Sequence, residues 1–169
     1  MNRTIRTVGM WSAIVAVGWM MTACGVERGN VASLEAADER NGPALEWKTD
    51  FDQAVQAAER LERPVLVNFT GSDWCGWCIR LHDEVFAHKP FQNYARHNLV
   101  LLEVDFPQGK ELSEEQSRAN QALAETYAVR GFPTILLLDA EGAVLARTGY
   151  QPGGSEAYVE HLRALLEAD

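Results

Sequence analysis

Two cysteines, Cys75 and Cys78, stand between a short apolar segment and a stretch of helical periodicity. Residues 65–70 (VLVNFT) are apolar and β-branched and are bounded by Pro64 and Gly71, which predicts a buried strand. The segment after the first cysteine returns to helical spacing. A helix N-terminus carries partial positive charge and free N–H groups, which stabilise a thiolate. This order of strand, cysteine pair and helix therefore indicates a redox-active dithiol on an α/β fold.

Helical and extended patterns alternate along the rest of the chain from about residue 44. Apolar periodicity and capping residues predict helices over 50–61, from Cys75 onward, from Ser113 or Ser117 to Tyr127, and from Gly153. Short β-branched runs predict strands over 65–70, 99–104, 134–138 and 143–148. Ser113 and Gln116 have the spacing of a capping box. The last two strands are expected to form a hairpin. This order predicts the α/β class, with a central mixed sheet of four to five strands and helices on both faces.

The first 23 residues differ in composition from the rest of the chain. They contain Arg3 and Arg6, no acidic residue, and an apolar run over 8–21 that is too short to span a membrane comfortably. This pattern predicts a secretory signal peptide. Residues 21–24 (MTAC) resemble the lipobox of bacterial lipoproteins, in which Cys24 becomes the lipidated first residue of the mature chain. An ordinary signal peptide and an uncleaved anchor are the alternatives, and all three place the rest of the chain outside the cytoplasm.

Residues 24–43 separate this leader from the domain that we expect over 44–169. They have no sustained apolar period and combine acidic residues with Gly and Asn, which predicts a flexible tether. Lipid on Cys24 would hold the domain close to a membrane while letting it rotate.

The two cysteines of the pair are expected to have different roles. Cys75 stands at the start of the helix, where we expect it to be exposed and acidic, and Cys78 lies one turn inside. We therefore expect Cys75 to attack a substrate disulfide and Cys78 to resolve the mixed disulfide that forms. A structural disulfide is the alternative, but it would stabilise the fold only weakly, because a bridge that encloses two residues removes little entropy from the unfolded chain.

A metal site is another interpretation of the cysteine pair. His82, His88 and His97 are further candidate ligands, which keeps a copper or zinc carrier open, although the chain has no second cysteine pair to complete a structural zinc site. Haem attachment is excluded because Ile79 stands where that motif needs a histidine. The formal net charge of −9 argues against nucleic acid as a partner.

Residues 68–78 (NFTGSDWCGWC) and residues 131–134 (GFPT) together resemble the thioredoxin superfamily. The resemblance runs from about residue 44 to the C-terminus. It is greatest to exported thioredoxin-like domains, including the C-terminal domain of the transmembrane thiol:disulfide interchange reductase. It implies a thioredoxin-like fold, protein thiols and disulfides as substrates, and no cofactor or metal besides the Cys75–Cys78 dithiol.

The resemblance also implies roles for residues around the dithiol. Pro133 would be a cis-proline that faces the sulfurs, and the backbone of Phe132 would pair with an extended substrate segment; a trans turn proline is the alternative. Trp74 and Trp77, with Gly76 between the cysteines, would belong to the active-site loop and contact substrate. The two tryptophans would instead be core residues if they were buried.

The residue that thioredoxins use as a proton relay differs in this chain. Thioredoxins place a buried Asp in the strand before the motif, and the matching position here, allowing one inserted residue, is Asn68. An amide cannot take the proton of Cys78, so either Asp73, Asp105 or water takes it, or the inner thiol reacts more slowly. The insert Gly-Trp, in place of the Gly-Pro of thioredoxin, leaves the reduction potential open.

These patterns together predict a membrane-tethered thiol:disulfide oxidoreductase of the bacterial cell envelope. We expect it to reduce protein disulfides and to exchange electrons with a redox partner in the membrane. Between Asp105 and Pro133 there is room for one helix, which argues against the inserted helical domain of periplasmic oxidases. A thiol-based metal carrier and a non-catalytic peptide-binding module on the same fold are the alternatives.

Overall fold

The structure is a computed structural model that describes residues 45–168. The signal peptide, the tether and Cys24 therefore lie outside the described residues. Within the described range, five strands form one sheet in the order β1-β3-β2-β4-β5. The strands are β1 (Trp47–Lys48), β2 (Val65–Thr70), β3 (Val100–Asp105), β4 (Thr134–Leu138) and β5 (Val144–Thr148). β1 and β2 run parallel to β3, whereas β4 runs antiparallel to β2 and β5, so the sheet is mixed as predicted.

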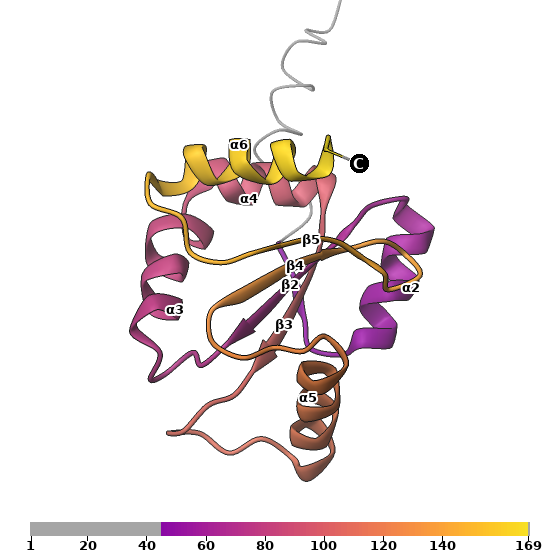
Figure 1. The fold of residues 1–169 in the computed structure, drawn as a ribbon, viewed down its shortest axis with the longest axis vertical. Coiled ribbons are helices and arrows are strands. Elements are labelled where there is room, and N and C mark those ends of the chain that lie inside the picture. Colours follow the sequence, from indigo (N-terminus) through magenta and orange to yellow (C-terminus); the bar gives the residue numbers. More distant parts are fainter. Residues whose placement is uncertain (1–44, 169) are drawn as a thin grey trace, which may run out of the picture.

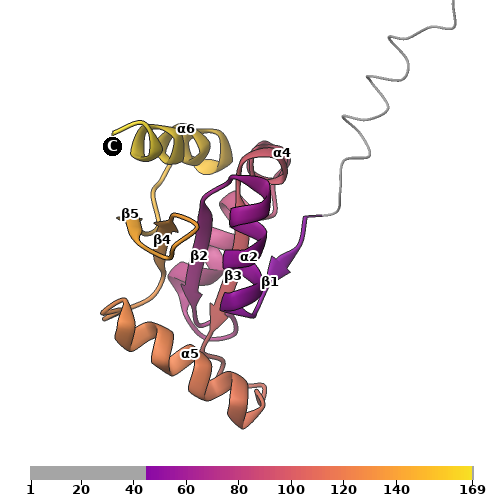
Figure 2. The ribbon, with the colours of Figure 1, turned by 90° about the vertical axis from the view of Figure 1, so that its right-hand side faces the viewer.

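Helices cover both faces of this sheet (Figure 1). They are α2 (Phe51–Leu61), α3 (Gly76–Leu81), α4 (Lys89–Asn98), α5 (Glu114–Thr126) and α6 (Gly154–Leu166), with a π-helical turn, η1 (His82–Phe86), that continues α3. Residues of α2 and α5 pack in the core on one face, and residues of α3, η1, α4 and α6 pack in the core on the other. In the view turned by 90°, α4 and α6 lie at one end of the molecule and α5 at the other (Figure 2).

Side chains alternate between the two faces along β2 and β3. Leu66 and Leu101 belong to the core beneath α3, η1, α4 and α6, and their chain neighbours belong to the core beneath α2 and α5. Side chains two residues apart on a strand share a face. Asn68 and Glu103 therefore lie on the face that α3 covers, toward the C-terminal ends of their strands.

Most of the expected elements are confirmed. The helix over 50–61 forms with Asp50 as its cap, because the Asp50 Oδ1 accepts a hydrogen bond from the Gln53 N–H (2.8 Å). The strands over 65–70 and 134–138 form as predicted, and the other two begin one residue later than predicted.

Only one of the two hydrogen bonds of the predicted capping box forms. The Ser113 Oγ accepts from the backbone N–H of Gln116 (3.1 Å), which fixes the start of α5. The Gln116 side chain does not return to Ser113: it donates to the Thr49 carbonyl (2.9 Å) and to Asn120 (2.8 Å). This residue therefore ties α5 to the segment before α2.

Two elements were not anticipated from the sequence. β1 has two residues, which is too few to show a period of alternation. α4 is a separate helix with a proline in its first turn, and two apolar residues, Phe91 and Ala95, are buried on a mostly polar segment. From the sequence alone, this region is expected to be part of the connection to β3.

Candidate active site

Cys75 and Cys78 form a disulfide at the start of α3, with their Cα atoms 5.2 Å apart. Cys75 is the N-terminal cap residue of the helix, and its Sγ accepts a hydrogen bond from the backbone N–H of Cys78 (3.2 Å). This N–H lies in the first turn of α3, where it also donates to the Cys75 carbonyl (2.9 Å), and it favours a negative charge on the Cys75 sulfur. The Cys75 sulfur, which we expect to be the more acidic of the two, therefore has a hydrogen-bond donor beside it.

The expectation that Cys75 is exposed is wrong for this disulfide-bonded state. Cys75 is 7% exposed and Cys78 is 5% exposed, so burial does not distinguish the two residues. Large exposed side chains lie beside them instead: Trp74 is 43% exposed and Trp77 is 56% exposed. The alternative that both tryptophans are core residues is therefore also wrong.

Trp74 is held in place by the segment after β3. Its indole N–H donates to the carbonyl of Phe106 (2.7 Å), and its ring packs edge-on against Phe132, with centroids 6.0 Å apart. Phe106 stacks on Phe132 in turn, at 5.1 Å. These contacts fix an aromatic surface next to Cys75. Phe106 is not among the site residues predicted from the sequence, although an aromatic residue directly after an active-site strand was the available signal.

Trp77 is supported from the other side by a cluster on α3, η1 and the segment after β5. Its ring contacts Tyr150, with centroids 5.2 Å apart, and the Arg80 guanidinium lies over both rings. The Glu84 carboxylate accepts from the Tyr150 hydroxyl (2.6 Å) and from the Arg80 Nε (2.7 Å). The hydrogen bond from Tyr150, followed by the one from Arg80, holds the pKa of Glu84 below its usual value. Sequence spacing had not connected Tyr150 with this helix.

The loop before β4 completes the surroundings of the disulfide. The Phe132–Pro133 peptide bond is cis, which confirms that prediction for Pro133 and excludes the trans alternative. The Thr134 hydroxyl donates to the Gly131 carbonyl (2.8 Å). An open groove of about 510 Å³ lies along this loop, with Arg130 and Arg147 among its lining residues. One of its lining residues, Phe132, contacts Trp74, which directly precedes Cys75.

Asp73, a predicted proton relay, joins the active-site loop to the loop after β3. Its carboxylate accepts from the backbone N–H of Gln108 (3.0 Å) and from that of Gly109. The hydrogen bond from Gln108, followed by that from Gly109, holds the pKa of Asp73 below its usual value. The structure therefore gives Asp73 a bridging position and keeps it ionised.

Asp105, the other candidate carboxylate, forms a second bridge between the same loops. It accepts from the Ser72 N–H (2.9 Å) and hydroxyl (2.7 Å), and it pairs with the Lys110 ammonium (2.8 Å). Burial alone would raise its pKa, but the hydrogen bonds from Lys110 and Ser72 outweigh burial and lower it. Asp105 is thus a fully engaged carboxylate at the C-terminal end of β3.

Asn68 and Glu103 form a polar pair beneath α3. Asn68 is 6% exposed, and its Oδ1 is buried without a hydrogen-bond partner among the described residues. Its Cα partner in the neighbouring strand is Glu103, which is half-buried. Burial, and then repulsion by Asp105, raises the pKa of Glu103 against the attraction of Lys110 and His82. Glu103 is not among the site residues predicted from the sequence; the available signal was a charged residue inside an apolar strand run.

The described part of the chain contains no cluster of side chains that would support the metal-carrier alternative. Over residues 45–168, no three His, Cys, Asp or Glu side chains group so as to hold a metal ion. His82, His88 and His97 are all exposed, and the His82 Nδ1 lies 3.1 Å from Asp83. Across the same residues, no helix is both long and apolar enough to cross a membrane.

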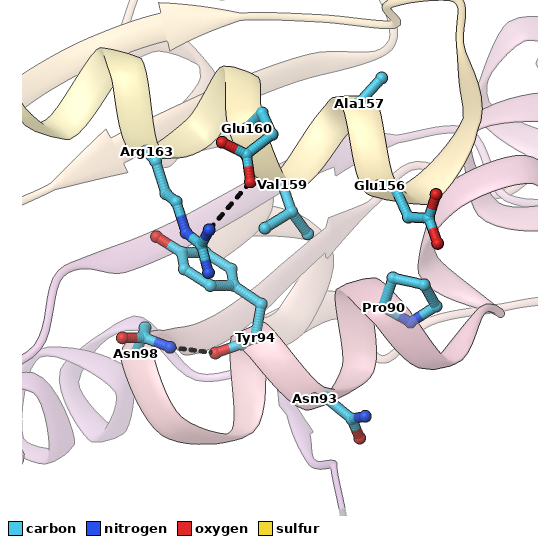
Figure 3. A pocket seen from close by; sticks show the side chains of 9 residues that line it. All are labelled: Pro90, Asn93, Tyr94, Asn98, Glu156, Ala157, Val159, Glu160 and Arg163. Carbon is cyan, nitrogen blue, oxygen red and sulfur yellow. Dashed lines mark hydrogen bonds and ion pairs between the residues drawn. The ribbon is translucent and has the colours of Figure 1, made fainter.

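A second pocket, of about 540 Å³, lies between α4 and α6 (Figure 3). On its wall Arg163 lies over the ring of Tyr94, at 5.2 Å from the centroid, and pairs with Glu160 (2.8 Å). Its lining residues include neither cysteine of the pair nor the loop of Pro133. The pocket is therefore separate from the disulfide site.

Comparisons with known proteins agree with this site. The thioredoxin-like domain family matches residues 51–164. The disulfide bond reductase DsbH of Chlamydia pneumoniae is 41% identical over 123 residues, which cover 73% of this chain and 74% of DsbH. A solved structure of the DsbH oxidoreductase has a TM-score of 0.70 at 39% identity, covering 76% of this chain and 88% of that chain.

A more distant relative is the thiol:disulfide interchange protein DsbD of Pseudoalteromonas atlantica. It is 25% identical over 144 residues, which cover 82% of this chain and 22% of DsbD. The family match, the similarity to DsbH and the disulfide at the start of α3 lead to one conclusion. The chain belongs to the thioredoxin-like family and is a thiol:disulfide oxidoreductase.

Proposed function

We propose that this protein is a protein-disulfide reductase of the cell envelope, with Cys75 as its nucleophile and Cys78 as its resolving thiol. The observation that carries this assignment is the hydrogen bond from the Cys78 N–H to the Cys75 Sγ (3.2 Å) at the start of α3. The same N–H donor stabilises a thiolate on Cys75 when the disulfide is reduced. The similarity to DsbH, a disulfide bond reductase, supports the direction of the reaction.

The reaction proceeds through one mixed disulfide. The Cys75 thiolate attacks a sulfur of the substrate disulfide, so that a bond from Cys75 to this sulfur forms and the other substrate sulfur leaves as a thiolate. Cys78 then loses its proton and attacks the Cys75 Sγ. The Cys75–Cys78 bond forms, the second substrate thiolate leaves, and two electrons have passed from the protein to its substrate. A thiol-bearing redox partner in the membrane then returns the disulfide to the dithiol state.

The substrate is a protein segment that lies across the surface next to the disulfide. Trp74 and Trp77 supply exposed aromatic area beside the sulfurs, and an extended segment is suited to pair with the backbone of Phe132 at the start of β4. Gly76 adds no side chain between the cysteines, and the space around its Cα is open. This surface accounts for protein thiols and disulfides as partners.

The place of action follows from the N-terminal sequence. Residues 1–23 have the pattern of a signal peptide, and Cys24 stands where a lipobox places the lipidated residue. Lipid on Cys24 and a tether over 24–43 would hold the domain over 44–169 at an extracytoplasmic membrane surface, within reach of a membrane redox partner.

A matched pair of variants tests the proposed roles. Reduced Cys78→Ser protein, mixed with an oxidised protein substrate such as insulin, is expected to accumulate a mixed disulfide because the attack on Cys75 has lost its nucleophile. Cys75→Ser, which leaves the more internal thiol, is expected to trap none. Both are read by non-reducing electrophoresis and mass spectrometry.

The reverse pattern, with trapping by Cys75→Ser, would contradict the assignment. Loss of a stoichiometrically bound copper or zinc ion on mutation of either cysteine would favour the metal carrier. Binding of the substrate without turnover by the unaltered protein would favour the peptide-binding module.

A further inference from the structure

A pair of polar side chains beneath α3 takes no part in the reaction as described so far. Asn68 and Glu103 are Cα partners on the adjacent parallel strands β2 and β3, and both face α3, where Cys78 and Leu81 are buried. Asn68 is an amide at the position where the family resemblance leads us to expect a carboxylate. The nearest strand position that carries a carboxylate on this face is Glu103.

The other carboxylates near the cysteines already accept hydrogen bonds from backbone or side-chain groups. Asp73 accepts from two backbone N–H groups of the loop after β3, and Asp105 accepts from Ser72 and pairs with Lys110. Both bridges favour the ionised form and make it a weak base. The acceptor of the Cys78 proton needs a higher pKa and must not be held by bonds that favour its ionised form.

Glu103 also has a route to solvent on its other side. β1 pairs with β3 only at Trp47–Leu101 and Lys48–Leu102, so the ladder ends one residue before Glu103. Glu103 is accordingly half-buried, whereas Asn68 on the inner strand is buried. A proton accepted beneath α3 can therefore leave at this edge of the sheet.

We propose that Glu103 accepts the proton of the Cys78 thiol when the mixed disulfide is resolved, an inference that rests on the function proposed above. In this step the S–H bond of Cys78 breaks and its proton goes to the Glu103 carboxylate. The sulfur's electron pair forms the bond to the Cys75 Sγ, and the bond from Cys75 to the substrate sulfur breaks. The substrate leaves as a thiolate, and Glu103 releases the proton to water.

The charges around Glu103 suit this role. Asp105, two residues along the same strand, repels its negative form, while Lys110 on the following loop and His82 on η1 attract it. Burial and Asp105 together outweigh the attraction of Lys110 and His82, so the pKa of Glu103 is raised. A raised pKa makes the carboxylate a better base toward a thiol than an exposed glutamate would be.

The test is the pH profile of the resolution step in the full-length chain. Reduced protein is mixed with excess insulin and quenched with acid, and the mixed disulfide and the Cys75–Cys78 product are counted over time. Glu103→Gln is expected to slow resolution by about tenfold or more at about pH 6, with the difference narrowing toward about pH 9 as the thiol ionises unaided. If Glu103 served only in packing, Glu103→Gln would change the free energy of unfolding and leave the pH profile of resolution unchanged.

Two further variants sharpen the comparison. Glu111→Gln removes the same charge from an exposed position after β3, and it is expected to keep the wild-type profile. Asn68→Asp combined with Glu103→Gln moves the carboxylate across one strand, and it is expected to recover most of the rate at about pH 6.

The inference is contradicted if Glu103→Gln has the rate and profile of Glu111→Gln. If Glu103→Gln does not fold, Glu103→Asp supplies the test: it keeps the charge on a shorter side chain and should still slow resolution at about pH 6, and an unchanged rate would overturn the proposal. If the wild-type protein reduces no insulin, the function proposed above fails. If it reduces insulin and Glu103→Gln does so equally well, this inference alone fails.

Discussion

At the scale of single residues, Glu103 makes the folded state less stable as the pH rises. Its pKa is raised above the value of 4.5 for a free glutamate, chiefly by burial. Between these two pKa values the folded protein binds more protons than the unfolded chain, so the free energy of unfolding falls as the pH rises through this window. Below the window the neutral carboxyl carries no such penalty. A proton acceptor at this half-buried position requires a charge that destabilises the folded state.

We therefore predict that Glu103→Gln stabilises the protein at neutral pH while it slows the reaction. The gain in the free energy of unfolding should be about 1 kcal/mol at neutral pH and should vanish below about pH 4, where Glu103 is neutral in both states. Urea unfolding of the oxidised protein at both pH values measures it, with Glu111→Gln as the control. A variant less stable than wild type at neutral pH would mean that the attraction between Glu103 and Lys110 outweighs the cost of burial.

At the scale of elements, the active-site loop is shaped by one close approach. The indole of Trp74 lies against the backbone of Gly71, and a Cβ atom at position 71 would overlap that ring. The bond from the indole N–H to the Phe106 carbonyl (2.7 Å) holds the ring in place. Gly76, five residues later, has no neighbouring atom within 4 Å of a Cβ atom built there.

We predict opposite effects of alanine at these two glycines. Gly71→Ala should displace Trp74, break its bond to Phe106, and lower the free energy of unfolding by about 1–3 kcal/mol. Gly76→Ala lies in the first turn of α3 and should raise it by up to about 1 kcal/mol. Denaturant unfolding of both variants in the oxidised state decides this. Equal stability of the two proteins would contradict the assigned packing of Trp74.

The elements and the cysteine pair could be predicted from sequence because their signals are local. The apolar run of β2, the Asp50 cap and the Gly131–Thr134 motif all act within a few residues. The partners of these elements are set by register, which local patterns do not contain. The pairing of Asn68 with Glu103 and the contact of Tyr150 with Trp77 thus became visible only in three dimensions. The exposure expected for Cys75 failed for the same reason, since the surrounding side chains bury it.

At the scale of the whole molecule, the fold brings the reacting residues together at one end of the central strands. The C-terminal ends of β2 and β3, the start of α3 and the loop before β4 meet there, while the pocket between α4 and α6 lies apart from it. The direction of electron flow then depends on how well the groups at this end of the strands stabilise the Cys75 thiolate. Among the described residues one N–H bond supports the sulfur, Cys75 is buried, and Arg80, the cation over the Trp77 ring, is paired with Glu84. Modest stabilisation of the thiolate favours a reducing dithiol.

The reduction potential of the Cys75–Cys78 couple tests this account most directly. The full-length protein is equilibrated with dithiothreitol or glutathione redox buffers, and the alkylated thiols are counted by mass spectrometry. We predict a value near that of thioredoxin, about −270 mV, which makes the protein an electron donor to protein disulfides. A value near about −120 mV would contradict the account, because the protein would then donate disulfides instead of reducing them.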